Sequence, residues 1–309
     1  MSILLLESLH PMAEAMLVEV DTVVRAVDPN APQTNFAEVR AILTRGRGRI
    51  TEALLRQCPN LLVIARAGVG LDNLDTGAAA KLKIPVVFAP GGNTLTVAEH
   101  TIALILDLVR GISRQAAAVA QGRWEDRAHY KGNEIRGLTL GVIGFGNIGK
   151  RVALLAHAFG MRVLVASHRA PILLPYEGLP LAEVLAQSDV LTLHLPLSPQ
   201  TRNLIGATEL AAMKRGAMLV NTARGALIDG AALRVALASG NLGGFAADVL
   251  EVEPPLCDDA LLRSERVLLT PHTASLTGLS YQSMCLDTVK NVCAILRGES
   301  PSPQNIFRG

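Results

Sequence analysis

The chain has no uninterrupted apolar run long enough to cross a bilayer. Half of its 309 residues are hydrophobic, yet charged residues interrupt every apolar stretch well short of the roughly 18–20 residues that a spanning helix needs. The first seven residues have no basic segment and only a very short apolar run, which predicts a first buried strand rather than a signal peptide. We therefore expect a cytoplasmic protein with no membrane partner.

Paired cysteines, clustered charge and metal-ligand motifs are also lacking. The four cysteines form no C-x-x-C pair, which favours reduced thiols over disulfides. The formal net charge is only +2 and the arginines are scattered, so no nucleic-acid partner is expected. No histidine or carboxylate cluster has the spacing of a metal site, and no metal is expected.

A glycine-rich turn near the middle of the chain is the most informative motif present. Gly144-Phe-Gly-Asn-Ile-Gly149 follows an apolar run at residues 139–143 and precedes a helical pattern at 150–156. In this order the first glycine permits a tight turn, the second lets the backbone approach a pyrophosphate, and the third lets the helix pack on the strand. N–H groups at the helix start then bind the pyrophosphate. The motif predicts a dinucleotide site containing Gly144, Gly146, Asn147, Ile148 and Gly149.

Short β-rich runs alternate with helical patterns on both sides of this turn. Before it we expect strands at residues 3–6, 41–43, 62–65 and 86–88, with helices at 51–57 and 74–82. After it we expect strands at 162–166, 190–194, 218–221, 243–249 and 266–269, and a last helix at 278–296. This alternation predicts an α/β fold built on parallel sheets with right-handed crossovers.

Residues 94–112 form the longest helical pattern before the glycine turn. Thr96 stands three residues before Glu99, a spacing typical of a capping box at a helix start. The helix is apolar around most of its surface, so we expect it to be buried between domains or against a second subunit. A two-fold homodimer is therefore the expected assembly.

Several segments resemble one enzyme family in their order and spacing. They are 137–149, His194-Leu-Pro-Leu with Thr201, Asn221-Thr-Ala-Arg-Gly, 248–254 and Pro271-His272. Over nearly its whole length the chain resembles the D-isomer-specific 2-hydroxyacid dehydrogenases. Residues 66–70 and 89–94 resemble most the phosphoglycerate dehydrogenase branch, of which this chain would be a short form without a C-terminal regulatory domain.

The resemblance implies two doubly wound parallel-sheet domains. A flavodoxin-like substrate domain, residues 1–96 plus 280–309, would be interrupted by a Rossmann dinucleotide-binding domain, residues 97–279, with the active site in the cleft. The implied reaction is hydride transfer between a nicotinamide cofactor and a small 2-oxo or 2-hydroxy acid.

Arg224, Glu253 and His272 are the expected catalytic residues. The planar guanidinium of Arg224 suits a substrate carboxylate and its neighbouring carbonyl oxygen. His272 would exchange the proton of the substrate oxygen, and Glu253 would stabilise its imidazolium and raise its pKa. Each has a non-catalytic alternative. Arg224 could cap a turn, His272 could be a structural histidine, and Glu253 could be a solvated loop residue. Glu251 competes for the role of Glu253, and only the spacing from Asp248 favours Glu253.

The resemblance implies further binding residues. Backbone N–H groups of Val69 and Gly70 would complete the carboxylate site, and Asp248 would contact the nicotinamide carboxamide, with a helix-capping role as its alternative. Arg66 lies where a guanidinium suits a phosphate or second carboxylate of the substrate; the alternative is an ion pair with Asp72. The other implied cofactor contacts are His194, Pro196, Thr201, Thr222 and Ala223.

The position that contacts the ribose departs from the NAD pattern. An NAD-binding Rossmann fold usually carries Asp or Glu about 20 residues after the glycine turn. Here the strand at 162–166 is followed by Ser167-His168-Arg169. Without a carboxylate, repulsion of a 2′-phosphate is removed, while serine and arginine offer it hydrogen-bond donors. We expect NADP to be preferred over NAD, the alternative being indifference between them.

The expected function is a D-2-hydroxyacid dehydrogenase or 2-oxoacid reductase similar to 3-phosphoglycerate dehydrogenase. An NADPH-dependent glyoxylate or hydroxypyruvate reductase fits the missing ribose carboxylate equally well. A cofactor-sensing corepressor on the same fold is the alternative of another class, and the complete set of Arg224, Glu253 and His272 argues against it.

Overall fold

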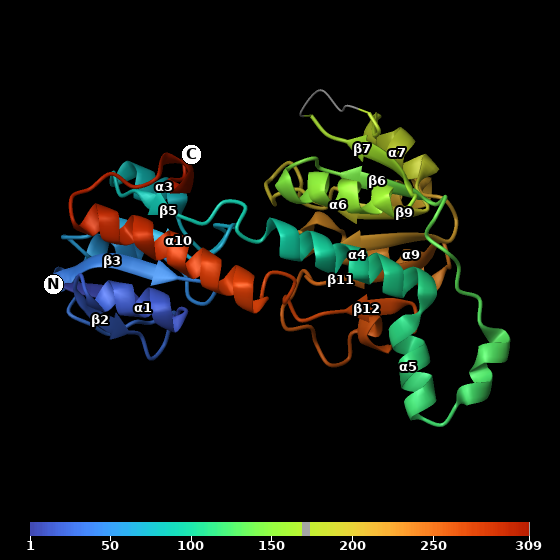
Figure 1. The fold of residues 1–309 in the computed structure, drawn as a ribbon, viewed down its shortest axis with the longest axis horizontal. Helices are drawn as coiled ribbons and strands as arrows, with labels where there is room; N and C mark the ends of the chain where they lie inside the picture. Colours follow the sequence, from blue (N-terminus) through green and yellow to red (C-terminus); the bar gives the residue numbers. More distant parts are fainter. Residues whose placement is uncertain (169–173, 309) are drawn as a thin grey trace. The chain divides into compact units, whose positions relative to one another are not determined.

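The computed structural model describes residues 1–168 and 174–308, which form two compact units (Figure 1). Unit 1 consists of Met1–Asn93 and Leu276–Gly309, and unit 2 of Thr94–Ser275. Unit 2 is thus inserted between the two segments of unit 1. The boundaries fall at 93/94 and 275/276, against the 96/97 and 279/280 placed from the sequence.

Unit 1 contains a five-stranded sheet of order β2-β1-β3-β4-β5, in which every pairing is parallel. Helices α1 (Pro11–Val18) and α10 (Gly278–Leu296) pack on one face, and α2 (Glu52–Gln57) and α3 (Thr76–Lys81) on the other. This is the strand order of a flavodoxin-like fold. The strands are β1 (Ser2–Leu5), β2 (Thr22–Arg25), β3 (Val39–Thr44), β4 (Val63–Arg66) and β5 (Val86–Val87).

Alternating side chains of unit 1 fill two cores, one on each face of the sheet. In β1, Ile3 and Leu5 belong to the core under α1 and α10, whereas Leu4 belongs to the core under α2 and α3. Since both faces are covered, the central strands carry apolar side chains at consecutive positions rather than only at every second one, as in Ile3-Leu4-Leu5 of β1. The C-terminal helix α10 completes the first of these cores with Val289 and Val292.

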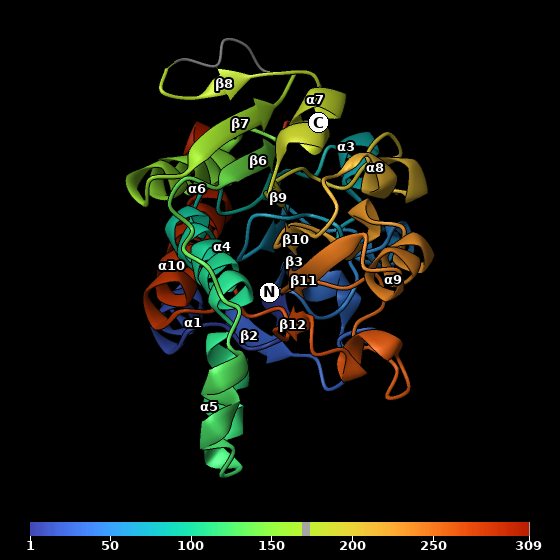
Figure 2. The ribbon, with the colours of Figure 1, turned by 90° about the vertical axis from the view of Figure 1, so that its right-hand side faces the viewer.

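Unit 2 contains a seven-stranded parallel sheet of order β12-β11-β10-β9-β6-β7-β8 (Figure 2). Helices α4 (Thr94–Arg110) and α6 (Asn147–Ala158) cover one face, and α7 (Leu181–Gln187), α8 (Ala207–Ala212) and α9 (Gly230–Ala238) the other. The order is that of a Rossmann fold extended by β12. The strands are β6 (Thr139–Ile143), β7 (Arg162–Ala166), β8 (Glu177–Gly178), β9 (Val190–Leu193), β10 (Ala217–Asn221), β11 (Leu242–Ala247) and β12 (Val267–Leu269).

The predicted fold class, two doubly wound parallel-sheet domains, is confirmed. The predicted strands and shorter helices are present with ends shifted by at most three residues, and α10 has the predicted bounds. Helices α1, α5 (Ile112–Ala120), α7, α8 and α9 and strands β2 and β8 were not predicted. Short 3-10 helices lie at η1 (Phe36–Glu38), η2 (Trp124–His129), η3 (Gly225–Leu227), η4 (Ala260–Arg263) and η5 (Pro303–Asn305).

Helix α4 starts at the predicted residue but ends earlier than predicted. It ends at Arg110 because Gly111 adopts a left-handed conformation with φ +62°, after which the chain continues in α5. It begins at Thr94, so Thr96 lies inside the helix and the predicted capping box is wrong. The Thr96 hydroxyl instead donates to the Ala274 carbonyl at 3.3 Å.

The burial of α4 takes place within unit 2. Eight of its side chains are buried, and the helix packs on α6 and on strands β10, β11 and β12. This packing accounts for its apolar surface, so the length and composition of α4 do not by themselves require a second subunit. Over the described ranges, no helix is long and apolar enough to span a bilayer.

Candidate active site

The glycine turn joins β6 to α6 as the sequence motif requires. Gly144 has φ +93°, and a Cβ there would lie 2.6 Å from the His194 carbonyl oxygen. A Cβ on Gly149 would lie 2.1 Å from the Gly144 carbonyl oxygen, so α6 packs directly on the turn. Around Gly146 no described atom lies within 4 Å of a Cβ position, and no described side chain caps α6. The turn therefore fits a pyrophosphate bound at the helix start.

The other predicted cofactor residues follow neighbouring strands at the carboxyl edge of the same sheet. Ligands of doubly wound sheets bind at this edge, where the strand order reverses, here between β6 and β9. Arg169 lies outside the described residues. Ser167 and His168 follow β7, His194, Pro196 and Thr201 follow β9, and Thr222 and Ala223 follow β10.

Hydrogen bonds shape the loop after β9. The His194 carbonyl and Cβ lie against the glycine turn, and its ring Nε2 lies 3.1 Å from the Thr192 hydroxyl. Burial lowers the pKa of His194 to about 3, so the ring is neutral at pH 7. The Thr201 hydroxyl accepts from the Ser198 N–H and donates to the Pro196 carbonyl, both at 2.8 Å. The loop therefore has a neutral imidazole at its start and is held by its own hydrogen bonds.

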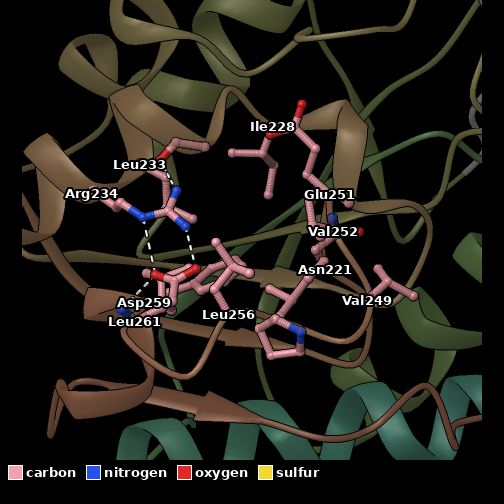
Figure 3. Close-up of a pocket in the computed structure, with 15 residues that line it drawn as sticks. Asn221, Ile228, Leu233, Arg234, Val249, Glu251, Val252, Leu256, Asp259 and Leu261 are labelled. Carbon is pink, nitrogen blue, oxygen red and sulfur yellow. Dashed lines mark hydrogen bonds and ion pairs between the residues drawn. The ribbon is translucent and has the colours of Figure 1, made fainter.

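Arg224, Glu253 and His272 lie on the loops after β10, β11 and β12, all in unit 2. The His272 Nδ1 lies 2.7 Å from Glu253 Oε2, and the Leu250 N–H donates to Glu253 Oε1 at 2.9 Å. Glu251 instead lines a separate pocket that also contains the Arg234–Asp259 ion pair (Figure 3). The structure thus pairs His272 with Glu253 and not with Glu251.

The pair is tuned by its surroundings. The hydrogen bond to Glu253 raises the pKa of His272 above its ordinary value, against the lowering effect of burial; the charges of Glu253 and Asp248 add to the rise, and Arg224 opposes it. Burial would raise the pKa of Glu253, but hydrogen bonds from His272 and the Leu250 N–H, with the charges of His272 and Arg224, bring it below its ordinary value. The two shifts favour an imidazolium–carboxylate pair, and both include the charge of Arg224.

Two contacts missed by sequence reasoning fix the loops that carry Arg224 and Glu253. The buried Asn221 side chain accepts from the Ala223 N–H and donates to the Arg224 carbonyl, both at 2.9 Å. A Cβ on Gly225 would lie 2.0 Å from the Leu250 carbonyl carbon, so the two loops are in direct backbone contact. A glycine after the arginine is the one sequence signal of that contact.

Asp248 anchors the loop that carries His272. This residue is only 2% exposed, and its Oδ1 accepts from the Thr270 hydroxyl at 2.6 Å and the Thr273 N–H at 2.8 Å. Its Oδ2 accepts from the Ala274 N–H at 2.8 Å, and its carbonyl accepts from the His272 N–H at 2.9 Å. These contacts hold the loop after β12 and not the start of a helix, so Asp248 does not have the helix-capping role of the alternative, and its contact with the cofactor stays a prediction.

The predicted substrate residues Arg66, Val69 and Gly70 belong to unit 1. Arg66 ends β4, and its guanidinium donates to the Arg45 carbonyl from Nε at 2.8 Å and to the Gly70 carbonyl from Nη1. Nη1 also lies 3.7 Å from Asp72 Oδ2, so the ion pair of the alternative is present. Arg66 therefore braces the turn that contains Val69 and Gly70.

A Rossmann sheet with this glycine turn and an imidazole–carboxylate pair at its carboxyl edge defines a dinucleotide-binding α/β protein equipped for proton exchange. The sequence model of the NAD-binding domain of the D-isomer specific 2-hydroxyacid dehydrogenases matches residues 102–274, more than half of the chain. The chain belongs to this family.

Individual relatives are similar over different lengths. A D-3-phosphoglycerate dehydrogenase of Archaeoglobus fulgidus is 42% identical over 245 residues, covering 77% of this chain and 46% of the relative. A hydroxypyruvate reductase of Thermotoga maritima is 38% identical over 258 residues, covering 82% and 84%. The crystal structure of D-lactate dehydrogenase from Aquifex aeolicus, complexed with NAD and lactic acid, has a TM-score of 0.91 and 30% identity, covering 100% and 99%. The chain spans about half the length of the phosphoglycerate dehydrogenases it matches.

Replacing Glu253 by glutamine should lower the pKa of His272, because the amide removes the negative charge that stabilises the imidazolium. A titration of the His272 ring protons by NMR measures the shift directly. Glu251→Gln is the matched control, since Glu251 faces the separate pocket, and it should leave the titration unchanged. An equal or larger shift in Glu251→Gln would contradict the pairing.

Proposed function

We propose that the chain is an NAD(P)-dependent D-2-hydroxyacid dehydrogenase, or 2-oxoacid reductase, acting on the CH–OH group of a small anionic acid. The observation that carries the proposal is the 2.7 Å bond between His272 and Glu253, at the sheet edge where family members of this fold bind their dinucleotide. Their pKa shifts both include the charge of Arg224, which supports a common site for the three residues.

In this proposal each protein group has one task in reduction. A bound nicotinamide supplies the hydride. His272 gives its proton from Nε2 to the carbonyl oxygen of the substrate, since Nδ1 is engaged with Glu253, and Glu253 keeps the imidazolium stable before the transfer. Arg224 binds the substrate carboxylate and polarises the carbonyl through its planar fork.

The cofactor is proposed to bind along the carboxyl edge of unit 2. Backbone N–H groups of residues 146–149 would hold the pyrophosphate, and the loops after β9 and β10 would flank it. The similar Aquifex structure contains NAD. The proposed preference for NADP rests instead on Ser167, which stands directly after β7, where NAD-binding folds carry a carboxylate.

Two substrate classes are proposed for comparison. Val69 and Gly70 would complete the carboxylate site, and Arg66 would face a phosphate if the substrate is 3-phosphoglycerate or 3-phosphohydroxypyruvate. The bonds from Arg66 to the Arg45 and Gly70 carbonyls, and its ion pair with Asp72, favour a bracing role instead. That bracing role supports the second candidate, a reductase of hydroxypyruvate or glyoxylate, compounds that carry no phosphate.

A homodimer is proposed from α5 and η2. Of the residues of α5 only Ala118 is buried, while Ile112, Val119 and Trp124 are each more than half exposed. In both views α5 extends away from the sheet of unit 2 (Figures 1 and 2). Exposed apolar side chains gathered on one projecting segment indicate an interface, and a second copy related by two-fold symmetry would cover them.

His272→Ala should lower kcat for reduction by about 10²–10⁴-fold while cofactor affinity stays within about twofold, because only the proton donor is lost. Arg224→Ala should raise KM and lower kcat, because the guanidinium acts in both ground and transition states. The measurement is the steady-state kinetics of wild type, His272→Ala, Arg224→Ala and Arg66→Ala. The substrates are 3-phosphohydroxypyruvate, hydroxypyruvate and glyoxylate. Arg263→Ala, at an exposed arginine of η4, is the control.

A preference for the phosphorylated acid that vanishes in Arg66→Ala would support the phosphate role of Arg66. A wild type that prefers hydroxypyruvate, with Arg66→Ala leaving that preference intact, would favour the second candidate. Cofactor binding without turnover of any acid would favour a cofactor-sensing protein such as a corepressor.

NADPH should give a higher kcat/KM than NADH, and Ser167→Asp should erase or reverse that preference by repelling the 2′-phosphate. Ser167→Ala separates the two effects of the change, because it removes the hydroxyl without adding charge. The measurement is kcat/KM with NADPH and with NADH for wild type, Ser167→Asp and Ser167→Ala. Equal efficiency of NADPH and NADH in wild type would show that this loop does not discriminate.

The chain should have the mass of a dimer by light scattering at micromolar concentration, and Val119→Glu should shift it toward the monomer. A charge buried against a second copy is costly, whereas one on an exposed surface is not. Leu256→Glu is the control, since Leu256 is 69% exposed but lies far along the chain on the loop before η4. A monomeric wild type would contradict the dimer.

A further inference from the structure

One face of α4 contacts the ends of the loop that carries His272. His100 Nε2 lies 3.0 Å from the Thr270 hydroxyl oxygen, and the Thr96 hydroxyl donates to the Ala274 carbonyl at 3.3 Å. Thr96 and His100 are four residues apart, so they share one side of the helix. The residues on either side of His272 are therefore both bonded to the same helix.

Proton counting fixes the direction of these bonds. The Thr270 hydroxyl has one proton, and it lies 2.6 Å from Oδ1 of Asp248, whose carboxylate can only accept. The hydroxyl therefore donates to Asp248 and accepts from His100, which requires a proton on His100 Nε2. A directed chain runs from His100 through Thr270 to Asp248, in which each bond polarises the next.

This chain ends on the group that holds the backbone of His272. Asp248 accepts from the Thr273 and Ala274 N–H groups with its carboxylate and from the His272 N–H with its carbonyl. His272 has φ +55°, a left-handed conformation that is uncommon for residues other than glycine. Such a conformation persists only where surrounding contacts hold it, and here they are the contacts made by Asp248.

We propose that His100 is a positioning residue for His272, acting through Thr270 and Asp248 to hold the imidazole where it exchanges its proton. The proposal rests on the proposed function for the task of His272, but not for the contacts. His100 touches neither substrate nor cofactor in this role. Loss of its Nε2–H removes the bond that ties Thr270 to α4 and takes away a donor that also lies 3.7 Å from Asp248 Oδ1, which loosens the loop and the bond between His272 and Glu253.

Three substitutions separate the hydrogen bond from the shape of the side chain. Glutamine carries an amide nitrogen at about the reach of Nε2, asparagine carries one only at about the reach of Nδ1, and leucine carries none. His100→Asn and His100→Leu should lower kcat by about tenfold or more, because a small misplacement of a catalytic group is costly. KM for acid and cofactor should stay within about twofold, and His100→Gln should retain most of the activity.

A second readout does not depend on turnover. NMR titration of His272 should show a lower pKa in His100→Asn than in wild type, because a loosened loop weakens the bond to Glu253, whereas His100→Gln should titrate like wild type. In the double variant His100→Asn/Thr270→Val the two losses should be less than additive, because His100 and Thr270 both contact Asp248, with His100 Nε2 3.7 Å from its Oδ1. His157→Asn, at an exposed histidine of the neighbouring helix α6, should change neither readout.

The outcomes distinguish the two proposals. If wild type reduces a 2-oxo acid but His100→Asn keeps both its kcat and the His272 pKa, the positioning role is wrong and the proposed function stands. If no acid is turned over while the His272 pKa falls in His100→Asn and is restored in His100→Gln, the positioning role stands and the proposed function fails. Equal losses in His100→Gln and His100→Asn would show that ring shape matters rather than the Nε2 donor, and would also overturn the proposal.

Discussion

The buried carboxylate of Asp248 is the group on which the geometry of the candidate active site depends. A carboxylate removed from water is strongly unfavourable unless hydrogen bonds replace its hydration. Asp248 obtains them from the Thr270 hydroxyl and from the N–H groups of Thr273 and Ala274. These donors lie on both sides of His272. The hydrogen bonds that stabilise the buried carboxylate therefore also fix the shape of the loop that carries His272. The left-handed backbone of His272 follows from these hydrogen bonds rather than from the local sequence.

Close backbone contacts impose a second constraint on the same edge. Gly149 packs on Gly144, and Gly225 packs on Leu250, at separations where a Cβ would collide with carbonyl groups. The first contact sets the start of α6 against the glycine turn, and the second joins the loops of Arg224 and Glu253. Because both involve backbone, which cannot change rotamer, they fix the loops more firmly than side-chain packing could.

The sequence predicted those parts of the protein that leave a local pattern. The apolar periodicity of 278–296 predicted α10, and the glycine spacing predicted the turn before α6. The pairing of Glu253 with His272 depended on the resemblance, because Glu251 is chemically identical and two residues away. Thr96 followed by Glu99 predicted a cap, but α4 already begins at Thr94, the start that the helical pattern itself indicated. His100 left no signal, because its partner Thr270 is 170 residues away along the chain.

Unit 2 separates the groups that would choose the cofactor from those that would do the chemistry. Ser167 and His168 follow β7, on one side of the switch point, whereas Arg224, Glu253 and His272 follow β10, β11 and β12 on the other. The bonds that hold the second group run through Asn221, Leu250 and Asp248, none of which lies on the loop after β7. The residues proposed to choose the cofactor and those proposed to do the chemistry thus stand on different loops of one sheet edge, on opposite sides of the switch point between β6 and β9.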